Sequence, residues 1–176
     1  MDFLNPKEVF SLNLIARLLL TSDGTLTDIV QAVFLEPIEL VKLSIEQCAA
    51  TELEESLEIR PSDPLMRRKI LLRGGVSGSN YVYAETLIAL NSLPEAVREG
   101  LVRSGSPIGR LWVQHKLETR KEVLSIWRER AGELGPHFGI TADADVLART
   151  YRVFTGGKPS MLISEYFPAT LGERLG

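Results

Sequence analysis

The chain has 176 residues, of which 44% are hydrophobic and 24% charged, close to the average for globular proteins. This composition excludes an intrinsically disordered chain, and the length fits one domain, which we expect to span residues 1–176. Twenty Lys and Arg against 23 Asp and Glu give a net charge of −3, which argues against electrostatic binding to nucleic acid.

The N-terminal segment shows neither a targeting sequence nor a membrane span. No basic region is followed by an apolar run and a small-residue cleavage site, so we expect no signal peptide. The longest apolar cluster, residues 12–20, is interrupted by Asn13 and Arg17 and is too short to cross a bilayer. The sequence therefore predicts a soluble, cytoplasmic protein with no membrane contact.

Two short helices joined by a tight turn are predicted at the N-terminus. Asn5-Pro6 provides the cap and first-position residues of a helix, and apolar residues then recur at helical spacing through the rest of the segment. Residues 22–24 end this first helix. A second, shorter helix is expected to begin at Thr25 or Thr27 and to end before Pro37.

After this second helix the hydrophobic pattern changes to the alternation of strands. Strands are predicted over residues 41–45, 66–72, 81–90, 146–154 and 159–167. The periodicity of residues 117–127 is ambiguous, and a long strand is favoured there. Turn residues at 73–80 and 155–158 predict two β-hairpins, and helices are expected at 94–102 and from Ser106-Pro107 onward. Hairpins with short turns imply antiparallel pairing. The predicted fold is therefore α+β, with a single antiparallel sheet and helices on one side.

Several common kinds of site are absent from the sequence. Cys48 is the single cysteine, which excludes an intramolecular disulfide and a cysteine-rich zinc site, and we expect it to be a small buried hydrophobe. His115 and His137 lack the spacing of a metal ligand set and are predicted to be structural. The glycine-rich residues 74–78 lie between strands, so they indicate a turn rather than a phosphate-binding loop.

Two charged residues interrupt the apolar faces of predicted strands. By alternation, Glu165 shares a face with Met161, Ile163 and Phe167. Arg68 in the same way shares a face with Met66, Ile70 and Leu72. Because burying a lone charge is costly, each is expected to have a partner or to face a polar cavity.

Two interpretations of this pair remain open. Either Arg68 and Glu165 pair with each other or face solvent, or they line a pocket in which Arg68 binds an anion and Glu165 handles a proton. A carboxylate among apolar neighbours has a raised pKa, which favours proton exchange near neutral pH. The segment Ser106-Pro107-Ile108-Gly109 either offers free backbone N–H groups to the same anion or is an ordinary capped turn.

A series of short blocks, taken in order and with their spacing, resembles the chorismate lyase (4-hydroxybenzoate synthase) family. The resemblance covers most of the chain, and it is strongest to the actinobacterial and cyanobacterial-type branch. The blocks are Leu18-Leu19-Leu20, Asp23-Gly24-Thr25-Leu26-Thr27, Arg68-Lys69-Ile70-Leu71-Leu72, Ala84-Glu85-Thr86-Leu87-Ile88, Ser106-Pro107-Ile108-Gly109-Arg110, Tyr151-Arg152-Val153, Gly157-Lys158-Pro159 and Ile163-Ser164-Glu165-Tyr166-Phe167.

The resemblance implies a fold, a reaction and a set of site residues. It implies an antiparallel sheet with a buried ligand site under helical flaps, and cleavage of chorismate into 4-hydroxybenzoate and pyruvate without metal or organic cofactor. Arg68 then matches the residue that holds the ring carboxylate, assisted by the backbone N–H of Ile108. Glu165 matches the carboxylate near the ring hydroxyl, as hydrogen-bond partner or general base. Leu26 matches a backbone N–H donor there, where the better-known branch has methionine after a shorter turn.

The resemblance also leaves alternatives. A second cation should meet the enolpyruvyl carboxylate, and Arg152 and Arg110 are candidates, although both also fit an exposed surface. The same fold resembles the effector-binding (UTRA) domains of bacterial transcription regulators, which are non-catalytic modules for small ligands. Those domains normally follow a winged-helix DNA-binding domain, for which we expect no room before the first helices, so the enzyme is favoured. A third possibility is a lyase that releases another hydroxybenzoate isomer.

Overall fold

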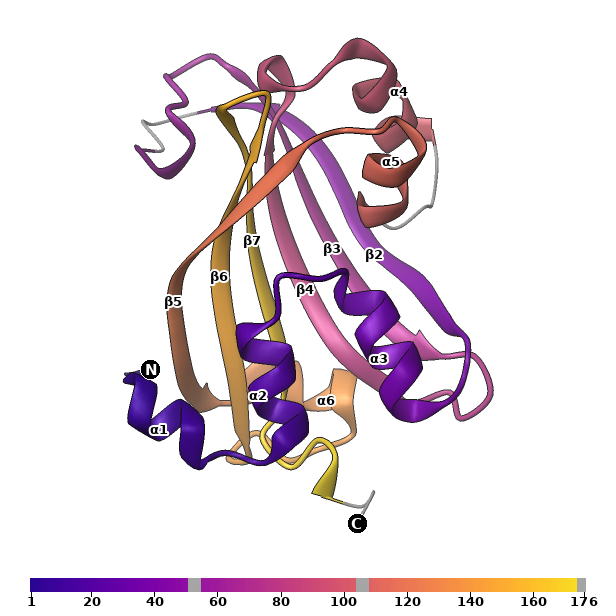
Figure 1. Ribbon diagram of the computed structural model, residues 1–176, viewed down its shortest axis with the longest axis vertical. Helices are drawn as coiled ribbons and strands as arrows, with labels where there is room; N and C mark the ends of the chain where they lie inside the picture. Colours follow the sequence, from indigo (N-terminus) through magenta and orange to yellow (C-terminus); the bar gives the residue numbers. More distant parts are fainter. Residues whose placement is uncertain (51–54, 104–107, 174–176) are drawn as a thin grey trace.

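The computed structural model describes residues 1–50, 55–103 and 108–173, in which seven strands form one antiparallel sheet (Figure 1). The order across the sheet is β1-β5-β6-β7-β4-β3-β2. The strands are β1 (Asp2–Phe3), β2 (Ile38–Ala49), β3 (Pro64–Gly74), β4 (Asn80–Ala89), β5 (Thr119–Arg130), β6 (Asp145–Thr155) and β7 (Lys158–Pro168). Each predicted strand is confirmed, and so are the β3–β4 and β6–β7 hairpins.

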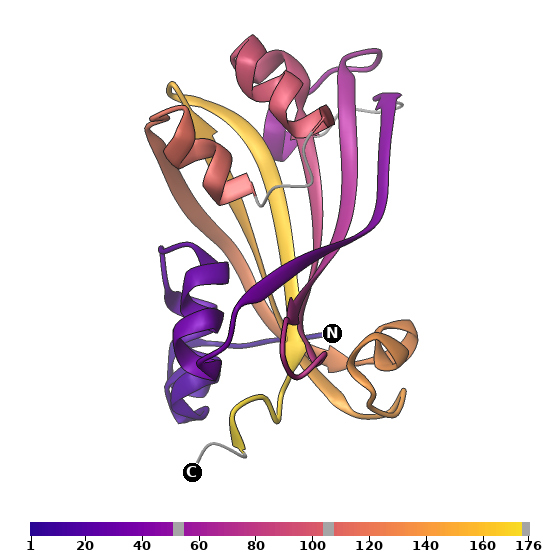
Figure 2. The same ribbon diagram turned by 90° about the vertical axis from the view of Figure 1, so that its right-hand side faces the viewer.

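Helices cover mainly one face of this sheet, as Figure 2 shows from the side. The helices are α1 (Pro6–Ser11), α2 (Leu14–Thr21), α3 (Leu26–Phe34), α4 (Glu95–Arg103), α5 (Ile108–Gln114) and α6 (Gly135–Phe138), with 3-10 turns at Glu55–Leu57, Leu90–Ser92 and Gly132–Leu134. The short helix α6 is the exception, because it lies against the opposite face, where the His137 ring stacks on Tyr83. The α+β architecture is confirmed. None of the described helices combines the length and apolarity needed to cross a bilayer.

The first predicted helix is broken into α1 and α2. Asn13 is extended and its side chain accepts a hydrogen bond from the backbone N–H of Ala16 at 2.8 Å, so it caps α2. A side chain that satisfies the backbone in this way offers an alternative to a continuous helix. The expectation of one helix through this segment is therefore wrong, whereas the tight turn between α2 and α3 is confirmed.

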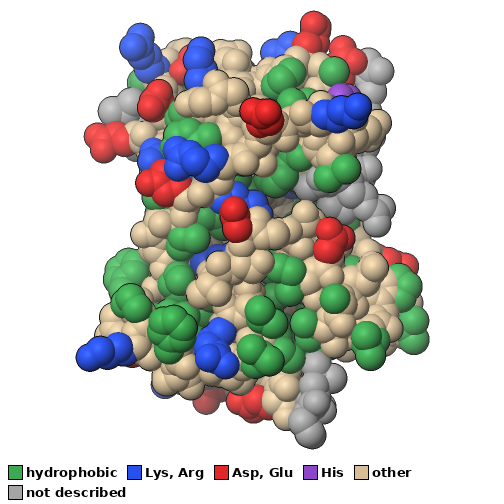
Figure 3. Space-filling model, viewed as in Figure 1, with side chains coloured by type: hydrophobic (Ala, Val, Ile, Leu, Met, Phe, Trp, Pro, Cys, Tyr) green, Lys and Arg blue, Asp and Glu red, His purple; other side chains and the backbone are tan. Residues whose placement is uncertain are grey.

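The helix-covered face carries two apolar clusters with a gap between them. One cluster joins α2 and α3 to the sheet and includes Leu19, Val30 and Phe167. The other lies under α4 and α5 and includes Val97 and Met161. In the space-filling view a hollow with basic side chains at its edge separates the two helical regions (Figure 3).

The end of β2 corrects one further expectation. Cys48 is exposed rather than buried. It pairs with Leu65 of β3, but β2 is the edge strand of the sheet, and no further strand covers it. An edge position leaves this small side chain in contact with solvent, so the burial expected from its hydrophobic character is wrong.

Candidate active site

Two neighbouring rows of paired residues bring the predicted site residues to the helix-covered face. The first row runs across β3, β4, β7 and β6 as Arg68, Thr86, Ile163 and Tyr151. The second row, one pleat further along, is Ile70, Ala84, Glu165 and Arg149. Residues directly opposite one another in a sheet share a face, so Arg68 and Glu165 lie on the same side with β4 between them.

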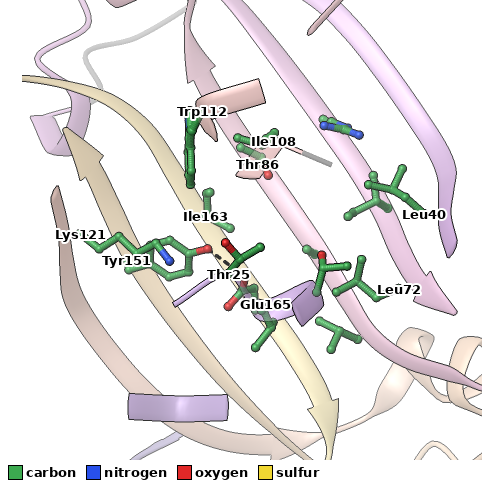
Figure 4. Close-up of a pocket in the computed structure, with 16 residues that line it drawn as sticks. Thr25, Leu40, Leu72, Thr86, Ile108, Trp112, Lys121, Tyr151, Ile163 and Glu165 are labelled. Atoms are coloured by element: carbon green, nitrogen blue, oxygen red, sulfur yellow. Dashed lines mark hydrogen bonds between the residues drawn. The ribbon is translucent and has the colours of Figure 1, made fainter. Parts of the chain in front are cut away.

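A cavity of about 600 Å3, including its opening to solvent, lies over these two rows (Figure 4). The four residues to which the family resemblance gives a role line it: Arg68, Glu165, Ile108 and Leu26. The other lining residues are Thr25, Thr27, Leu40, Ile70, Leu72, Val82, Ala84, Thr86, Trp112, Lys121, Tyr151 and Ile163. Small side chains on the central strand β4 make room for the cavity, and residues at the start of α3 and on helix α5 form part of its wall.

Arg68 is a buried cation in this cavity. Its side chain comes from β3, and the residue is only 2% exposed. Burial lowers the pKa of the Arg68 guanidinium from its usual value, yet arginine stays charged in proteins. A planar guanidinium can bond both oxygens of a carboxylate, so this position suits an acidic ligand.

Glu165 is buried as well, and its charge partner is Arg149 rather than Arg68. The Nε of Arg149 donates to Oε2 of Glu165 at 2.7 Å, and both side chains are almost inaccessible to solvent. The alternative in which Arg68 and Glu165 pair directly is wrong, because Glu165 pairs with Arg149 and β4 separates the strands that carry Arg68 and Glu165. The Arg149 guanidinium offsets the cost of burying the Glu165 carboxylate.

Tyr151 completes the surroundings of Glu165. Its hydroxyl donates to Oε1 of Glu165 at 2.8 Å. Burial, together with the neighbouring Glu165, raises the pKa of Tyr151 well above its ordinary value. The hydroxyl therefore stays protonated and acts as a hydrogen-bond donor that fixes the orientation of the carboxylate.

The turn between α2 and α3 is held over the cavity by two cations of the sheet. Arg149 Nη1 donates to the carbonyl of Ser22 at 2.8 Å. Lys121 Nζ donates to the carbonyls of Asp23 and Gly24, both at 2.8 Å. This turn leads into α3, whose first residue is Leu26. The first N–H groups of a helix have no partner within it and carry the positive end of its dipole, which suits an electron-rich ligand group.

The sequence interpretation missed Arg149, Tyr151 and Lys121. For Arg149 a signal was present, because alternation places it on the same face as Leu147 and Val153, in an apolar strand pattern like that of Arg68. Lys121 lies in a segment whose periodicity is ambiguous, and only the pairing of β5 with β6 brings it to the cavity.

From the sequence, Arg152 and Arg110 are candidates to bind the enolpyruvyl carboxylate, and the structure tests the first of them. Arg152 lies on the opposite side of β6, where its Nη2 contacts Oε2 of Glu122 at 2.8 Å, and it is not among the described residues that line the cavity. That candidate is wrong. The side chain of Arg110, and the proposed cap at Ser106-Pro107, lie outside what the structure describes. Neither histidine is among the described lining residues.

The family model described as "Chorismate pyruvate-lyase Rv2949c-like" matches residues 20–175. The chain belongs to this family. A curated relative named chorismate pyruvate-lyase, from Mycobacterium tuberculosis (strain H37Rv), is 31% identical over 170 residues, which cover 94% of this chain and 85% of the relative. A second, with the same name and from Mycobacterium leprae (strain TN), is 30% identical and covers 93% of this chain and 79% of its own length.

The solved structures that resemble this family member include PhnF and the ligand-binding domain of a putative transcriptional regulator. PhnF from Mycobacterium smegmatis superposes with a TM-score of 0.68 at 11% identity, over 84% of this chain and 65% of that chain. The ligand-binding domain of a putative GntR-family regulator from Bordetella bronchiseptica gives 0.60 at 17% identity, over 74% and 85%. At such identities the likeness concerns the fold alone, and it confirms the expected relation to the effector-binding fold.

Proposed function

We propose that this protein is a chorismate lyase that releases pyruvate and 4-hydroxybenzoate. The observation that carries the proposal is that Arg68 and Glu165 line a single cavity on one face of the sheet, from strands separated by β4. Membership of the chorismate pyruvate-lyase family, with relatives of that name at about 30% identity over most of the chain, supports the reaction.

The cavity offers a partner for each end of the ring. Arg68 binds the ring carboxylate, with the backbone N–H of Ile108 as a second donor. Glu165 accepts a hydrogen bond from the ring hydroxyl, and the backbone N–H of Leu26 lies at the same end. Apolar lining residues such as Ile163 and Trp112 contact the ring and exclude water.

The reaction requires little covalent chemistry from the protein. The bond between the ring and the ether oxygen breaks, the neighbouring ring carbon loses its proton, and the electron pair of that C–H bond makes the ring aromatic. The enolpyruvate that departs gains a proton and becomes pyruvate. The protein holds the substrate in a reactive conformation in a dry site, and Glu165 is the group we assign to assist the movement of the proton.

The separation of the two polar groups supports the 4-hydroxy product in particular. Arg68 and Glu165 lie two strands apart, which corresponds to roughly 10 Å between their backbones. A carboxylate held by Arg68 and a hydroxyl held by Glu165 therefore belong at opposite ends of a ring. In the 2- and 3-hydroxy isomers the two groups are closer together.

The proposal is tested by incubating the purified protein with chorismate and measuring pyruvate and the aromatic product. Pyruvate and 4-hydroxybenzoate are expected in equal amounts, with the three hydroxybenzoates as chromatographic standards. Another isomer would contradict the product assignment. Folded protein that binds 4-hydroxybenzoate but releases no pyruvate would instead indicate a non-catalytic binding module.

A further inference from the structure

The proposed site still lacks a residue that binds the second carboxylate of chorismate. Chorismate is a dianion, and Arg68 accounts for the ring carboxylate alone. Among the described residues that line the cavity, the charged ones are Arg68, Lys121 and Glu165. Arg149 pairs with Glu165, so Lys121 is the lining cation besides Arg68 that can meet the second carboxylate of such a substrate.

The contacts of the Lys121 ammonium group use two of its three N–H donors. Its ammonium group has three N–H donors, and the carbonyls of Asp23 and Gly24 accept two of them. These two bonds hold the nitrogen beside the Tyr151 ring, 5.4 Å from its centroid. Figure 4 shows the Lys121 side chain directed toward Glu165 and Thr25. Among the described residues no hydrogen-bond acceptor is assigned to the third donor, and the side chain lines the cavity.

The order of the groups across the sheet agrees with the order of the groups on the substrate. Lys121 lies on β5 and Arg68 on β3, with Glu165 on β7 between them. On chorismate the enolpyruvyl ether and the hydroxyl occupy neighbouring ring carbons, and the ring carboxylate lies at the far end from the hydroxyl. A ring with its carboxylate at Arg68 and its hydroxyl at Glu165 can therefore direct the enolpyruvyl group toward β5.

We propose that Lys121 binds the enolpyruvyl carboxylate of chorismate and so selects the substrate over its aromatic product. The inference rests on the proposed function and adds the residue that recognises the leaving half of the substrate. No proton is transferred in this contact, since the ammonium donates a hydrogen bond to a carboxylate that is already ionised. Burial lowers the pKa of Lys121, and an incoming carboxylate offsets the desolvation that causes this shift.

The test compares two ligands that differ in the enolpyruvyl group. In Lys121→Met, kcat/KM for chorismate is expected to fall by about 10- to 100-fold, mainly through KM, as for the loss of a hydrogen bond to a charged group. The Kd for 4-hydroxybenzoate, which lacks that carboxylate, should stay within about twofold of the wild-type value. Lys121→Arg retains the charge and is expected to restore most of kcat/KM.

Two further variants serve as comparators. Lys69→Met removes a lysine that pairs with Glu85 on the opposite face of the sheet, and it should leave both constants unchanged. Arg68→Met should weaken the binding of both ligands, because both carry the ring carboxylate.

The possible failures are distinguishable. Wild-type protein without turnover contradicts the proposed function itself. Active wild-type enzyme with an unchanged kcat/KM in Lys121→Met overturns the assignment of Lys121. An equal loss for chorismate and 4-hydroxybenzoate also overturns it, because Lys121 would then act only by holding the turn at Asp23 and Gly24.

Discussion

Two glutamates of this protein are buried to a similar degree and yet have very different surroundings. Glu36, between α3 and β2, is 9% exposed, and Glu165 is 6% exposed. Oε2 of Glu36 accepts from the backbone N–H groups of Val76 and Ser77, both at 2.8 Å. Its Oε1 accepts from the hydroxyls of Ser77 and Tyr81. No cation contributes to these bonds.

Glu165 instead contacts a cation and has acceptor positions that the described residues leave unused. Among the described residues, Arg149 donates to one of its oxygens and Tyr151 to the other. A carboxylate offers about four acceptor positions, so Glu36 is saturated by the protein and Glu165 is about half occupied. The comparison teaches that burial alone does not mark a functional carboxylate. What sets Glu165 apart, in the role proposed for it, is that it lines the cavity with acceptor positions that the described residues leave unused.

The saturated carboxylate has a structural task. Glu36 joins the end of the α3 segment to the turn between β3 and β4, and so links a helix of the cavity wall to the sheet. The approach is so close that a Cβ at Gly74 would lie 2.4 Å from Oε1 of Glu36, which explains a glycine at that position.

The largest expected effect concerns the half-occupied carboxylate. Glu165→Gln keeps the size of the side chain but removes the charge and the basic oxygen, so kcat with chorismate should fall by about 100- to 10,000-fold. Steady-state pyruvate release measures this loss, and the melting temperature reports on folding. Glu85→Gln, on the opposite face, is the matched control and should stay within about twofold. A kcat close to wild type in folded Glu165→Gln would remove Glu165 from the mechanism.

A smaller effect is expected at the hydroxyl that orients Glu165. Tyr151→Phe deletes one hydrogen bond to a charged group, and a decrease in kcat of about 10-fold follows. The bond from Arg149 remains, so the loss should be smaller than for Glu165→Gln. Tyr83→Phe removes a comparable bond to Glu85 on the other face and serves as control. Equal losses in the two tyrosine variants would show that the effect is general rather than located at the site.

Much of the fold was predictable because each element follows one rule over several residues. Alternation indicated strands such as β2, whereas the periodicity of the segment that forms β5 was ambiguous. Turn residues gave the hairpins, as at Gly156 and Gly157, whose positive φ values of 58° and 81° suit a two-residue connection. The break at Asn13 escaped prediction because a capping side chain overrides an apolar pattern that continues on both sides.

Part of the candidate site was predictable from the sequence, but the contacts between its residues were not. Arg68 and Glu165 stood out as charges within apolar strand faces, and both line the cavity. Which charge meets which depends on strand order, and β7 lies between β6 and β4. That order pairs Glu165 with Arg149 and brings Lys121 to the same wall. Long-range pairing of this kind leaves no trace in the pattern of a single strand.

The smallest effect on catalysis, with a clear effect on stability, is expected at the saturated carboxylate. Hydrogen bonds from Tyr81, and from the backbone and hydroxyl of Ser77, lower the pKa of Glu36 from 4.5 to about 2. A lowered pKa in the folded state means that ionised Glu36 stabilises the fold above about pH 4.5, and that this contribution is lost as the pH falls toward 2. Glu36→Gln should therefore lower the melting temperature at neutral pH while leaving kcat/KM of the folded enzyme within about twofold.

The pH dependence separates this role from that of an ordinary surface charge. The difference in melting temperature between wild type and Glu36→Gln should be largest near pH 6 and should shrink as the pH is lowered to about 3, because Glu36 is then mostly protonated in the unfolded chain and has to lose this proton on folding. Glu39→Gln, on an exposed side chain nearby, should show no such trend. A difference that stays constant over this range would mean that the shape of Glu36, and not its charge, closes the turn. The contrast with Glu165 would then rest on the number of hydrogen bonds alone.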